Sequence, residues 1–298
     1  MTITHGQILG GIVTTPDLDA ALTDYADVLG LALLDQGSVP ADLAASWASP
    51  DVAGARMALL QPTSGHPCFI RLVEQPVPTA FRPTTSYGWA AFELSVQNVF
   101  GWPDRLNGSG FAIVGPPKEL EGLPYFVPMQ VTGRGAEMLY LNEVRSNTPS
   151  SDLPMADSPV DRIFICILAA RDREATCDWY ARTLCLDLGD TYVLAYSMIN
   201  SAFGLDPDTK SALTMVQKGR MTILEVDDYP PQTLDRPQDP GRLPPGNALV
   251  TLALDTLDRP GLDWLTPPAP RAGPLYAGRR SGTVRGPSGE LLELVEIG

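Results

Sequence analysis

Positive charge and histidine are both scarce in this sequence of 298 residues. It contains 21 lysines and arginines against 35 aspartates and glutamates, giving a formal net charge of −14, and only two histidines, His5 and His66. The basic residues are scattered along the chain, whereas binding to nucleic acid or to an anionic membrane requires them to be clustered. The composition therefore argues against both of these partners.

Long apolar segments are also missing. No stretch approaches the roughly 18 uninterrupted apolar residues that a membrane-spanning helix needs. The first residues, MTITHGQILGG, contain neither the basic start nor the long apolar centre of a signal peptide. We therefore expect a cytoplasmic protein that does not enter the membrane.

The four cysteines form no C-x-x-C pair, and Cys68, Cys166, Cys177 and Cys185 lie in apolar or helical stretches. This spacing favours buried, reduced thiols over a zinc site or a disulfide framework. What the chain does contain is 44% apolar residues, 29 prolines and 27 glycines. That composition is sufficient for two ordinary hydrophobic cores with many turns, so we expect two domains.

Three segments of the first half of the chain recur in the second half at offsets of 155, 154 and 153 residues. The matching pairs are 10–33 with 163–188, 68–76 with 222–230, and 133–144 with 286–297. In the first pair, an alternating strand leads through an acidic turn into a helix, and Asp17 precedes Tyr25 by the same spacing as Asp172 precedes Tyr180. A regular internal repeat of this kind indicates duplicated structural units.

The repeat divides the chain into two similar halves, 1–147 and 160–298, joined by the Ser- and Pro-rich linker 148–159. We expect each half to form one domain. Within each half, a Pro-rich connector separates two strand–helix–strand–strand–strand modules. The four predicted modules are 1–75, 84–147, 160–230 and 245–298.

The element TTPDLDAALTDYADVLGL, together with the C-terminal GPSGELLELVE, resembles the vicinal oxygen chelate superfamily, which includes glyoxalases, bleomycin-resistance proteins and extradiol dioxygenases. The resemblance covers essentially the whole chain as four βαβββ modules. It implies an α+β fold with two glyoxalase-like domains, in which paired modules curl their mixed β-sheets into cups. The inner face of such a cup holds a metal or a ligand.

In that superfamily the metal ligands come from the first and the last strand of each module. The resemblance places the first-strand positions at Gly10, Ala91, Ile165 and Ala248, and the last-strand positions at Arg71, Tyr140, Glu225 and Glu293. A stable transition-metal site needs at least three side-chain ligands, often including imidazole, and the first-strand residues here cannot bind a metal. We therefore predict no metal or other cofactor, and a divalent metal would need an atypical ligand set.

Strand alternation adds Glu93 to these positions. It lies two residues beyond Ala91 and so faces the same side of its strand. The other modules carry Ile12, Ile167 and Val250 at this place. Glu93 is therefore a further carboxyl group that we expect inside a cup.

Two pairings of the modules are open from the sequence. If they pair in sequence order, one cup collects Glu93, Arg71 and Tyr140, and the other collects Glu225 and Glu293. If the first module pairs with the fourth, Arg71 faces Glu293, and Tyr140 shares a cup with Glu225. The residues do not decide between these arrangements.

The residue types at these positions suggest proton transfer. A carboxylate surrounded by apolar side chains has a raised pKa, as a general base or acid near neutrality requires, and a Tyr or Arg opposite it could stabilise an oxyanion. We therefore predict a metal-independent lyase or isomerase that acts on a small apolar or aromatic substrate. The catalytic candidates are Glu93, Glu293, Tyr140, Arg71 and Glu225. The structural alternatives are an ion pair between Glu93 and Arg71, and a relic of an ancestral site at Glu225 and Glu293.

Four further residues are candidates for substrate binding. Tyr125 and Tyr192 lie in Met- and aromatic-bearing strands of the kind that line apolar pockets. His66 is predicted to be an exposed loop residue that could serve a cup mouth as a proton shuttle. Arg279 could bind a substrate carboxylate at a rim, or remain solvated.

Two other functions fit the same sequence. One is a non-catalytic protein that sequesters a small molecule, as bleomycin-resistance members do. The other is a metal-dependent dioxygenase or lyase with an atypical ligand set. In each case the expected partner is a small molecule, and we expect a monomer or a homodimer.

Overall fold

The computed structural model describes residues 2–298, and across these residues the strands form two eight-stranded mixed sheets. Sheet 1 contains β1 (Ile8–Thr15), β2 (Ala32–Ser38), β3 (Arg56–Gln61), β4 (Phe69–Glu74), β13 (Asn247–Leu254), β14 (Ala269–Pro270), β15 (Arg280–Arg285) and β16 (Leu291–Glu296). Sheet 2 contains β5 (Gly88–Val96), β6 (Ala112–Gly115), β7 (Phe126–Thr132), β8 (Met138–Val144), β9 (Val160–Ala170), β10 (Asp187–Ala195), β11 (Lys210–Lys218) and β12 (Met221–Asp228). The predicted α+β fold is confirmed.

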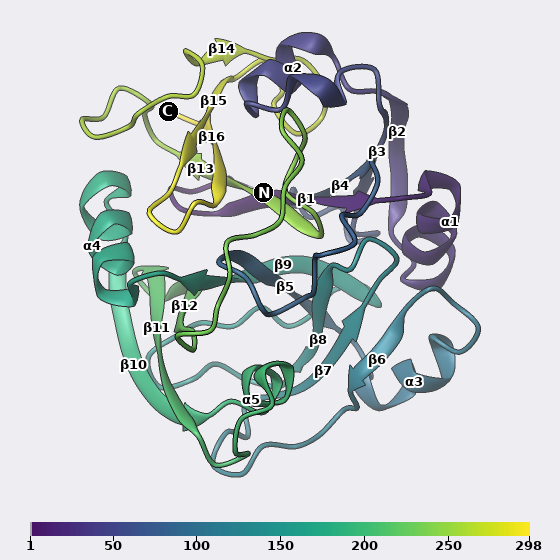
Figure 1. The fold of residues 1–298 in the computed structure, drawn as a ribbon, viewed down its shortest axis with the longest axis vertical. Coiled ribbons are helices and arrows are strands. Elements are labelled where there is room, and N and C mark those ends of the chain that lie inside the picture. Colours follow the sequence, from purple (N-terminus) through teal and green to yellow (C-terminus); the bar gives the residue numbers. More distant parts are fainter. Residues whose placement is uncertain (1) are drawn as a thin grey trace.

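The helices are short and lie at the edges and outer faces of the sheets (Figure 1). They are α1 (Leu18–Leu22), the π-helical turn η1 (Thr23–Val28), α2 (Ala41–Ser46), the 3-10 turns η2 (Pro50–Val52) and η3 (Val99–Gly101), α3 (Trp102–Arg105), α4 (Arg173–Leu184) and α5 (Ser197–Phe203). Among residues 2–298, no helix has the length and apolar character needed to cross a membrane.

The sequence repeat is visible in how the first helix of each half begins. Asp17 caps α1 by accepting a hydrogen bond from the Ala20 amide at 3.0 Å, and Asp172 caps α4 by accepting one from the Ala175 amide at 2.9 Å. Such N-cap carboxylates pair with backbone N–H groups that a helix leaves without partners. The aspartate of the recurring acidic turn therefore caps the N-terminus of the following helix in both halves.

The first module pairs with the fourth, and the second with the third. The strand order is β14-β15-β16-β13-β1-β4-β3-β2 in sheet 1 and β10-β11-β12-β9-β5-β8-β7-β6 in sheet 2. At the two module junctions, β1 runs antiparallel to β13 and β5 runs antiparallel to β9. The sheets thus do not follow the two halves of the sequence, because each sheet takes one module from either half.

The two sheets pack against each other, and each has an outer face covered by a helix. In Figure 1, α2 lies over sheet 1 at the top and α5 lies under sheet 2 at the bottom. We call the face of sheet 1 that carries α2 cup 1, and the face of sheet 2 that carries α5 cup 2. One apolar cluster lies between the sheets, a second lies in cup 1 and a third lies in cup 2.

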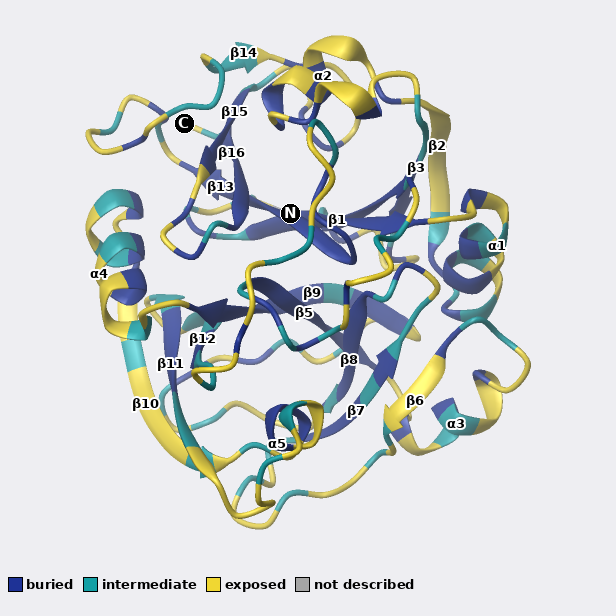
Figure 2. Cartoon of the chain, in the orientation of Figure 1, coloured by how far each residue is buried: buried dark blue, intermediate teal, exposed yellow. Residues whose placement is uncertain are grey.

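Burial follows this layering. The central strands of both sheets are buried, whereas the edge strands β2, β6 and β10 are exposed (Figure 2). Two equivalent hydrogen bonds link the sheets: Tyr25 donates to Glu137 and Tyr180 donates to Glu290, each at 2.9 Å. The symmetry of the repeat is therefore kept in the contacts that hold the two sheets together.

Candidate functional site

Cup 1 is filled by a buried ion pair between Arg71 on β4 and Glu293 on β16. Arg71 Nη2 donates to Glu293 Oε2 at 2.7 Å, and the two side chains are 2% and 0% exposed. This contact follows directly from the pairing of the first and fourth modules, one of the two arrangements that the sequence leaves open. An ion pair buried to this degree is stabilising only when further hydrogen bonds satisfy both partners.

Three further hydrogen bonds satisfy the oxygens of the Glu293 carboxylate. Trp47, which follows α2, donates its indole N–H to Oε1 at 3.0 Å, and the Tyr276 hydroxyl donates to the same oxygen at 2.9 Å. The Thr251 hydroxyl donates to Oε2 at 2.8 Å. Although burial alone would raise the pKa of Glu293, the charge of Arg71 and these hydrogen bonds together lower it.

Aromatic rings enclose the Arg71 guanidinium as well. Its Cζ atom lies 5.2 Å from the Trp47 ring centre and 6.0 Å from that of Tyr276, and Nη1 donates to the Tyr276 hydroxyl at 2.7 Å. Cation–π contacts of this kind stabilise a desolvated guanidinium. Cup 1 therefore contains a cation, its counter-ion and its aromatic walls within one chain, which favours the structural role for Arg71 and Glu293.

Cup 2 encloses a cavity of about 260 Å³ instead. Its walls are mostly apolar side chains from β7, β9 and β11, such as Phe126, Phe164 and Met215. The segment predicted as a linker also contributes to the wall, through Thr148, Ser151 and Leu153. A concave apolar cavity with a few convergent polar groups is the usual form of a small-molecule site.

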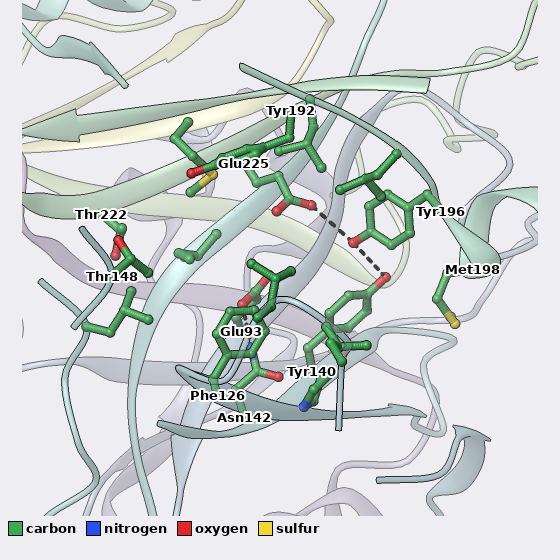
Figure 3. Close-up of a pocket in the computed structure, with 18 of the residues that line it drawn as sticks. Glu93, Phe126, Tyr140, Asn142, Thr148, Tyr192, Tyr196, Met198, Thr222 and Glu225 are labelled. Atoms are coloured by element: carbon green, nitrogen blue, oxygen red, sulfur yellow. Dashed lines mark hydrogen bonds between the residues drawn. The ribbon is translucent and has the colours of Figure 1, made fainter. Parts of the chain in front are cut away.

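Three polar residues predicted to face inward lie in this cavity. Glu93 on β5, Tyr140 on β8 and Glu225 on β12 all line it (Figure 3). The Tyr196 hydroxyl, at the start of α5, donates to Glu225 Oε1 at 3.1 Å and lies 3.5 Å from the Tyr140 hydroxyl. These three side chains form the dashed chain in Figure 3.

Burial raises the pKa of both carboxyl groups in cup 2. The pKa of Glu225 rises to about 7, because desolvation outweighs the hydrogen bond from Tyr196 that favours the ionised form. The pKa of Glu93 rises well above its usual range through desolvation and the nearby charge of Glu225. Near neutral pH, Glu225 can therefore both accept and release a proton.

Asn142 and Asp227 are two further buried polar residues close to Glu93 and Glu225. Asn142 Nδ2 donates to Glu93 Oε2 at 2.5 Å, while its buried Oδ1 atom has no hydrogen-bond partner. Asp227 is 1% exposed, and neither of its carboxyl oxygens has a hydrogen-bond partner among the described residues. Desolvation raises its pKa well above the usual range. The environment of Asp227 therefore favours its protonated form.

The family's ligand positions in cup 1 do not fit a metal. Among residues 2–298, no group of three or more His, Cys, Asp or Glu side chains is placed to hold a metal ion. In cup 1, one of the family's ligand positions is taken by the Arg71 cation. At the first-strand position Gly10, a Cβ atom would lie 1.9 Å from the Phe69 carbonyl oxygen, so this place cannot carry a ligand side chain.

The register corrects the sequence alignment of the fourth module. Thr251 lies opposite Glu293, as Glu93 lies opposite Tyr140, so Thr251 and not Val250 stands at the place of Glu93. Val250 belongs instead to the apolar cluster between the sheets. The one-residue error arose because the turn residue Asp255 follows Thr251 by four residues, whereas Asn98 follows Glu93 by five, so counting the same distance back from the turn reaches Val250.

His66 is not the exposed loop residue that the sequence predicts. It is 6% exposed, because its loop packs against the start of β9, where Ser64 donates to Asp161 at 2.7 Å. It lines a second cavity of about 330 Å³, which shares the wall residues Leu153, Phe164 and Thr222 with the cup 2 cavity. Burial and the charge of Arg162 lower the pKa of His66 to about 4, so the ring is neutral at pH 7.

The other predicted binding residues lie in different places. Tyr192 on β10 lines the cup 2 cavity and donates to Asp190 at 3.2 Å. Tyr125 packs on the outside of the same apolar cluster and is not among the residues that line the cavity. Arg279 lies beside Tyr276 in the loop before β15, and its amide donates to the Tyr276 carbonyl at 3.0 Å. Arg279 is thus on the side of cup 1.

Five residues of the two cups escaped sequence reasoning. Asn142 and Asp227 each lie two residues beyond a predicted position, so strand alternation could have placed them in cup 2. Trp47, Tyr276 and Tyr196 come from segments outside the three matched repeat pairs, and nothing in the sequence shows that they turn inward.

The fold is shared with solved structures. Glyoxalase I from Zea mays aligns with a TM-score of 0.62 and 18% sequence identity, covering 97% of this chain and 92% of that chain. A putative dioxygenase from Bacillus subtilis aligns with a TM-score of 0.63 and 12% identity, covering 99% of this chain and 86% of that chain. No protein-family model matches the sequence, and no curated protein matches it.

These similarities confirm the resemblance at the level of the fold. The chain has the fold of the vicinal oxygen chelate superfamily, with two glyoxalase-like domains. At 12% and 18% identity, the alignments show shared architecture and leave the chemistry to the residues of the two cups.

Proposed function

We propose that cup 2 is the active site of a metal-independent lyase or isomerase that acts on a small, largely apolar or aromatic carbonyl compound. The observation that carries this proposal is a titratable carboxyl group, Glu225, on the wall of a mostly apolar cavity. It accepts a hydrogen bond from the Tyr196 hydroxyl, which in turn lies 3.5 Å from the Tyr140 hydroxyl. We expect the reaction to take place in the cytoplasm, which stays a prediction.

In this mechanism, Glu225 removes a proton from the carbon next to the substrate carbonyl. The electron pair of the broken C–H bond moves onto the carbonyl oxygen and forms an enolate. Burial raises the pKa of Tyr140, so its hydroxyl remains protonated and can donate a hydrogen bond to that oxygen. Protonated Glu225 then returns the proton to a different carbon in an isomerisation, or to a leaving group in a lyase reaction.

The roles of the other polar groups follow from their contacts. Tyr196 donates to Glu225 Oε1, which favours the ionised form of the base and holds its orientation. Glu93 is held by Asn142 and is not required for proton transfer in this scheme. The apolar walls exclude water, which strengthens each of these electrostatic contacts.

Exchange of substrate protons for deuterium tests this proposal without knowledge of the product. A panel of small aromatic ketones and aldehydes is incubated with the protein in D₂O, and the loss of the α-proton signal is followed by NMR. We expect the wild-type protein to accelerate exchange and Glu225→Gln to slow it by about 10²- to 10⁴-fold, the usual contribution of a general base. The matched control is Glu174→Gln, whose carboxylate is 85% exposed on α4.

Two outcomes would contradict the proposal. One is exchange at the wild-type rate in Glu225→Gln. The other is tight binding of panel members with no exchange in the wild-type protein, which would favour sequestration of a small molecule, since the cavity alone would suffice for that function. Thermal unfolding of each variant shows whether it remains folded.

A further inference from the structure

The two cups are related by the sequence repeat, and comparing equivalent positions shows that cup 2 lacks the cation present in cup 1. Arg71 and Glu225 are equivalent in the repeat, and so are Glu293 and Tyr140. In cup 1, these positions provide a cation together with its carboxylate. In cup 2, Glu225 takes the place of the cation, and Glu93 adds a second carboxyl group.

No charge of the opposite sign balances these groups. Among the described residues that line the cup 2 cavity, there is no Lys, Arg or His. Two carboxyl groups without a counter-ion in an apolar cavity are costly to ionise, and their raised pKa values reflect this cost. A positively charged ligand would remove the imbalance that Arg71 removes in cup 1.

The hydrogen-bonding groups point to the same kind of ligand. The unpartnered Oδ1 of Asn142, which is 1% exposed, is an acceptor on the cavity wall next to Glu93. The carboxyl oxygens of Glu93 and Glu225 are further acceptors. An ammonium group has three donors and no acceptor, so it matches this set, and the rings of Tyr140 and Tyr196 provide aromatic walls like those around Arg71.

We propose that cup 2 selects a small organic cation, a protonated amine carried on an apolar or aromatic body, and that Glu93 and Asn142 bind its ammonium group. This inference rests on the proposed function only in placing the ligand in the same cavity. It adds a substrate class: an amino-carbonyl compound would place its amine at Glu93 and its reactive carbon near Glu225. Anionic compounds are disfavoured, because the described lining has two carboxyl groups and no cation.

Amine binding should depend on pH. The titratable groups facing Glu225 and Glu93 are Asp227 on the same strand as Glu225, Tyr140 on β8, Tyr196 before α5, Tyr229 after β12, and Cys166 on β9. All have raised pKa values, which keeps the tyrosines and the cysteine protonated near pH 7, so the carboxyl groups are the groups that respond. The ammonium ion favours their ionised form, so binding releases protons and tightens as the pH rises from 5 to 8.

Isothermal titration calorimetry with matched ligands tests the proposal. The probes are triples that share one phenyl, naphthyl or cyclohexyl frame and end in an alkyl amine, an alcohol or a carboxylate. At pH 8 we expect the amine of at least one triple to bind about tenfold or more tightly than its alcohol, and the carboxylate to bind least. If binding releases protons, the observed binding enthalpy should differ between two buffers of different ionisation enthalpy.

Substitutions of single residues test whether Glu93 binds the ammonium group of the ligand. Glu93→Gln should bring the affinity for the amine to within about threefold of that for the alcohol, while Glu174→Gln should leave the preference intact. Equal or weaker binding of the amine in every triple overturns the proposal, as does an amine preference that survives in Glu93→Gln. Tight amine binding without α-proton exchange would sustain this inference and reject the proposed catalysis, so the two failures are distinguishable.

Discussion

Cup 1 and cup 2 occupy equivalent faces of the same repeated fold, yet they use their interiors in opposite ways. In cup 1, Trp47 and Tyr276 turn inward and complete a buried ion pair. In cup 2, the interior remains a cavity lined by carboxyl and hydroxyl groups with no internal cation among the described lining residues. The comparison indicates that one copy has become part of the core, while the other has kept a cup able to receive a ligand.

The largest effect is expected from breaking the ion pair of cup 1. Arg71→Met leaves Glu293 buried with its charge uncompensated, so we expect the free energy of unfolding to fall by about 3–5 kcal/mol. Urea denaturation measures this loss. The double variant R71M/E293M removes both charges and should recover much of it. If Arg71→Met lost less than about 1 kcal/mol, the ion pair would not be the centre of a structural core.

The second prediction is that replacing a buried glutamate by glutamine changes the pH dependence of stability with opposite sign in the two cups. The pKa of Glu225 is raised from 4.5 to about 7, so folded protein retains a proton that unfolded protein releases in this range. Wild-type protein should therefore lose up to about 3 kcal/mol of unfolding free energy relative to Glu225→Gln as the pH rises from 4.5 to above 7.

Glu293 should behave in the reverse manner. Its pKa is lowered in the folded state, so its contribution to stability is present above its ordinary pKa of 4.5 and is lost as the pH falls through the folded value. The stability of wild-type protein should exceed that of Glu293→Gln at pH 7, and the two should converge in acid. Curves of the same sign for both variants would contradict the distinction between the cups.

The smallest effects are expected from removing one tyrosine hydroxyl in each cup. Tyr276→Phe deletes one of several hydrogen bonds to Glu293, so it should cost about 1–2 kcal/mol of unfolding free energy and leave α-proton exchange unchanged. Tyr196→Phe removes a hydrogen bond that lowers the pKa of Glu225, so the rise of the exchange rate with pH should move to higher pH. An unmoved profile in Tyr196→Phe would argue against Glu225 as the base.

The repeat predicted the modular organisation, the family resemblance predicted the fold and most of the inward positions, and strand alternation added Glu93. Arg71, Tyr140, Glu225 and Glu293 are all placed in the last strands of their modules, and all face a cup. The sequence could not choose between the two module pairings, because strands β1 and β9 are both mostly apolar and would accept either partner.

The sequence did not predict which side chains of the irregular segments point into the protein. Nothing in the pattern around Trp47 or Tyr276 distinguishes a residue that fills a cup from one that covers it. His66 shows the same limit, since a loop with turn residues is expected at the surface, and only its packing against Arg162 and Asp161 makes it buried. Such contacts depend on tertiary structure and not on local periodicity.

The pairing of the outer modules also sets an order of assembly. All strands of sheet 2 come from one continuous stretch of chain, whereas sheet 1 requires Ile8 of β1 to pair with Leu252 of β13. Because closing a long loop costs conformational entropy, and synthesis delivers the chain from its N-terminus, we expect sheet 2 to form first. The first module would then remain incomplete until the fourth emerges, and Arg71 would be the last buried charge in the molecule to receive its partner.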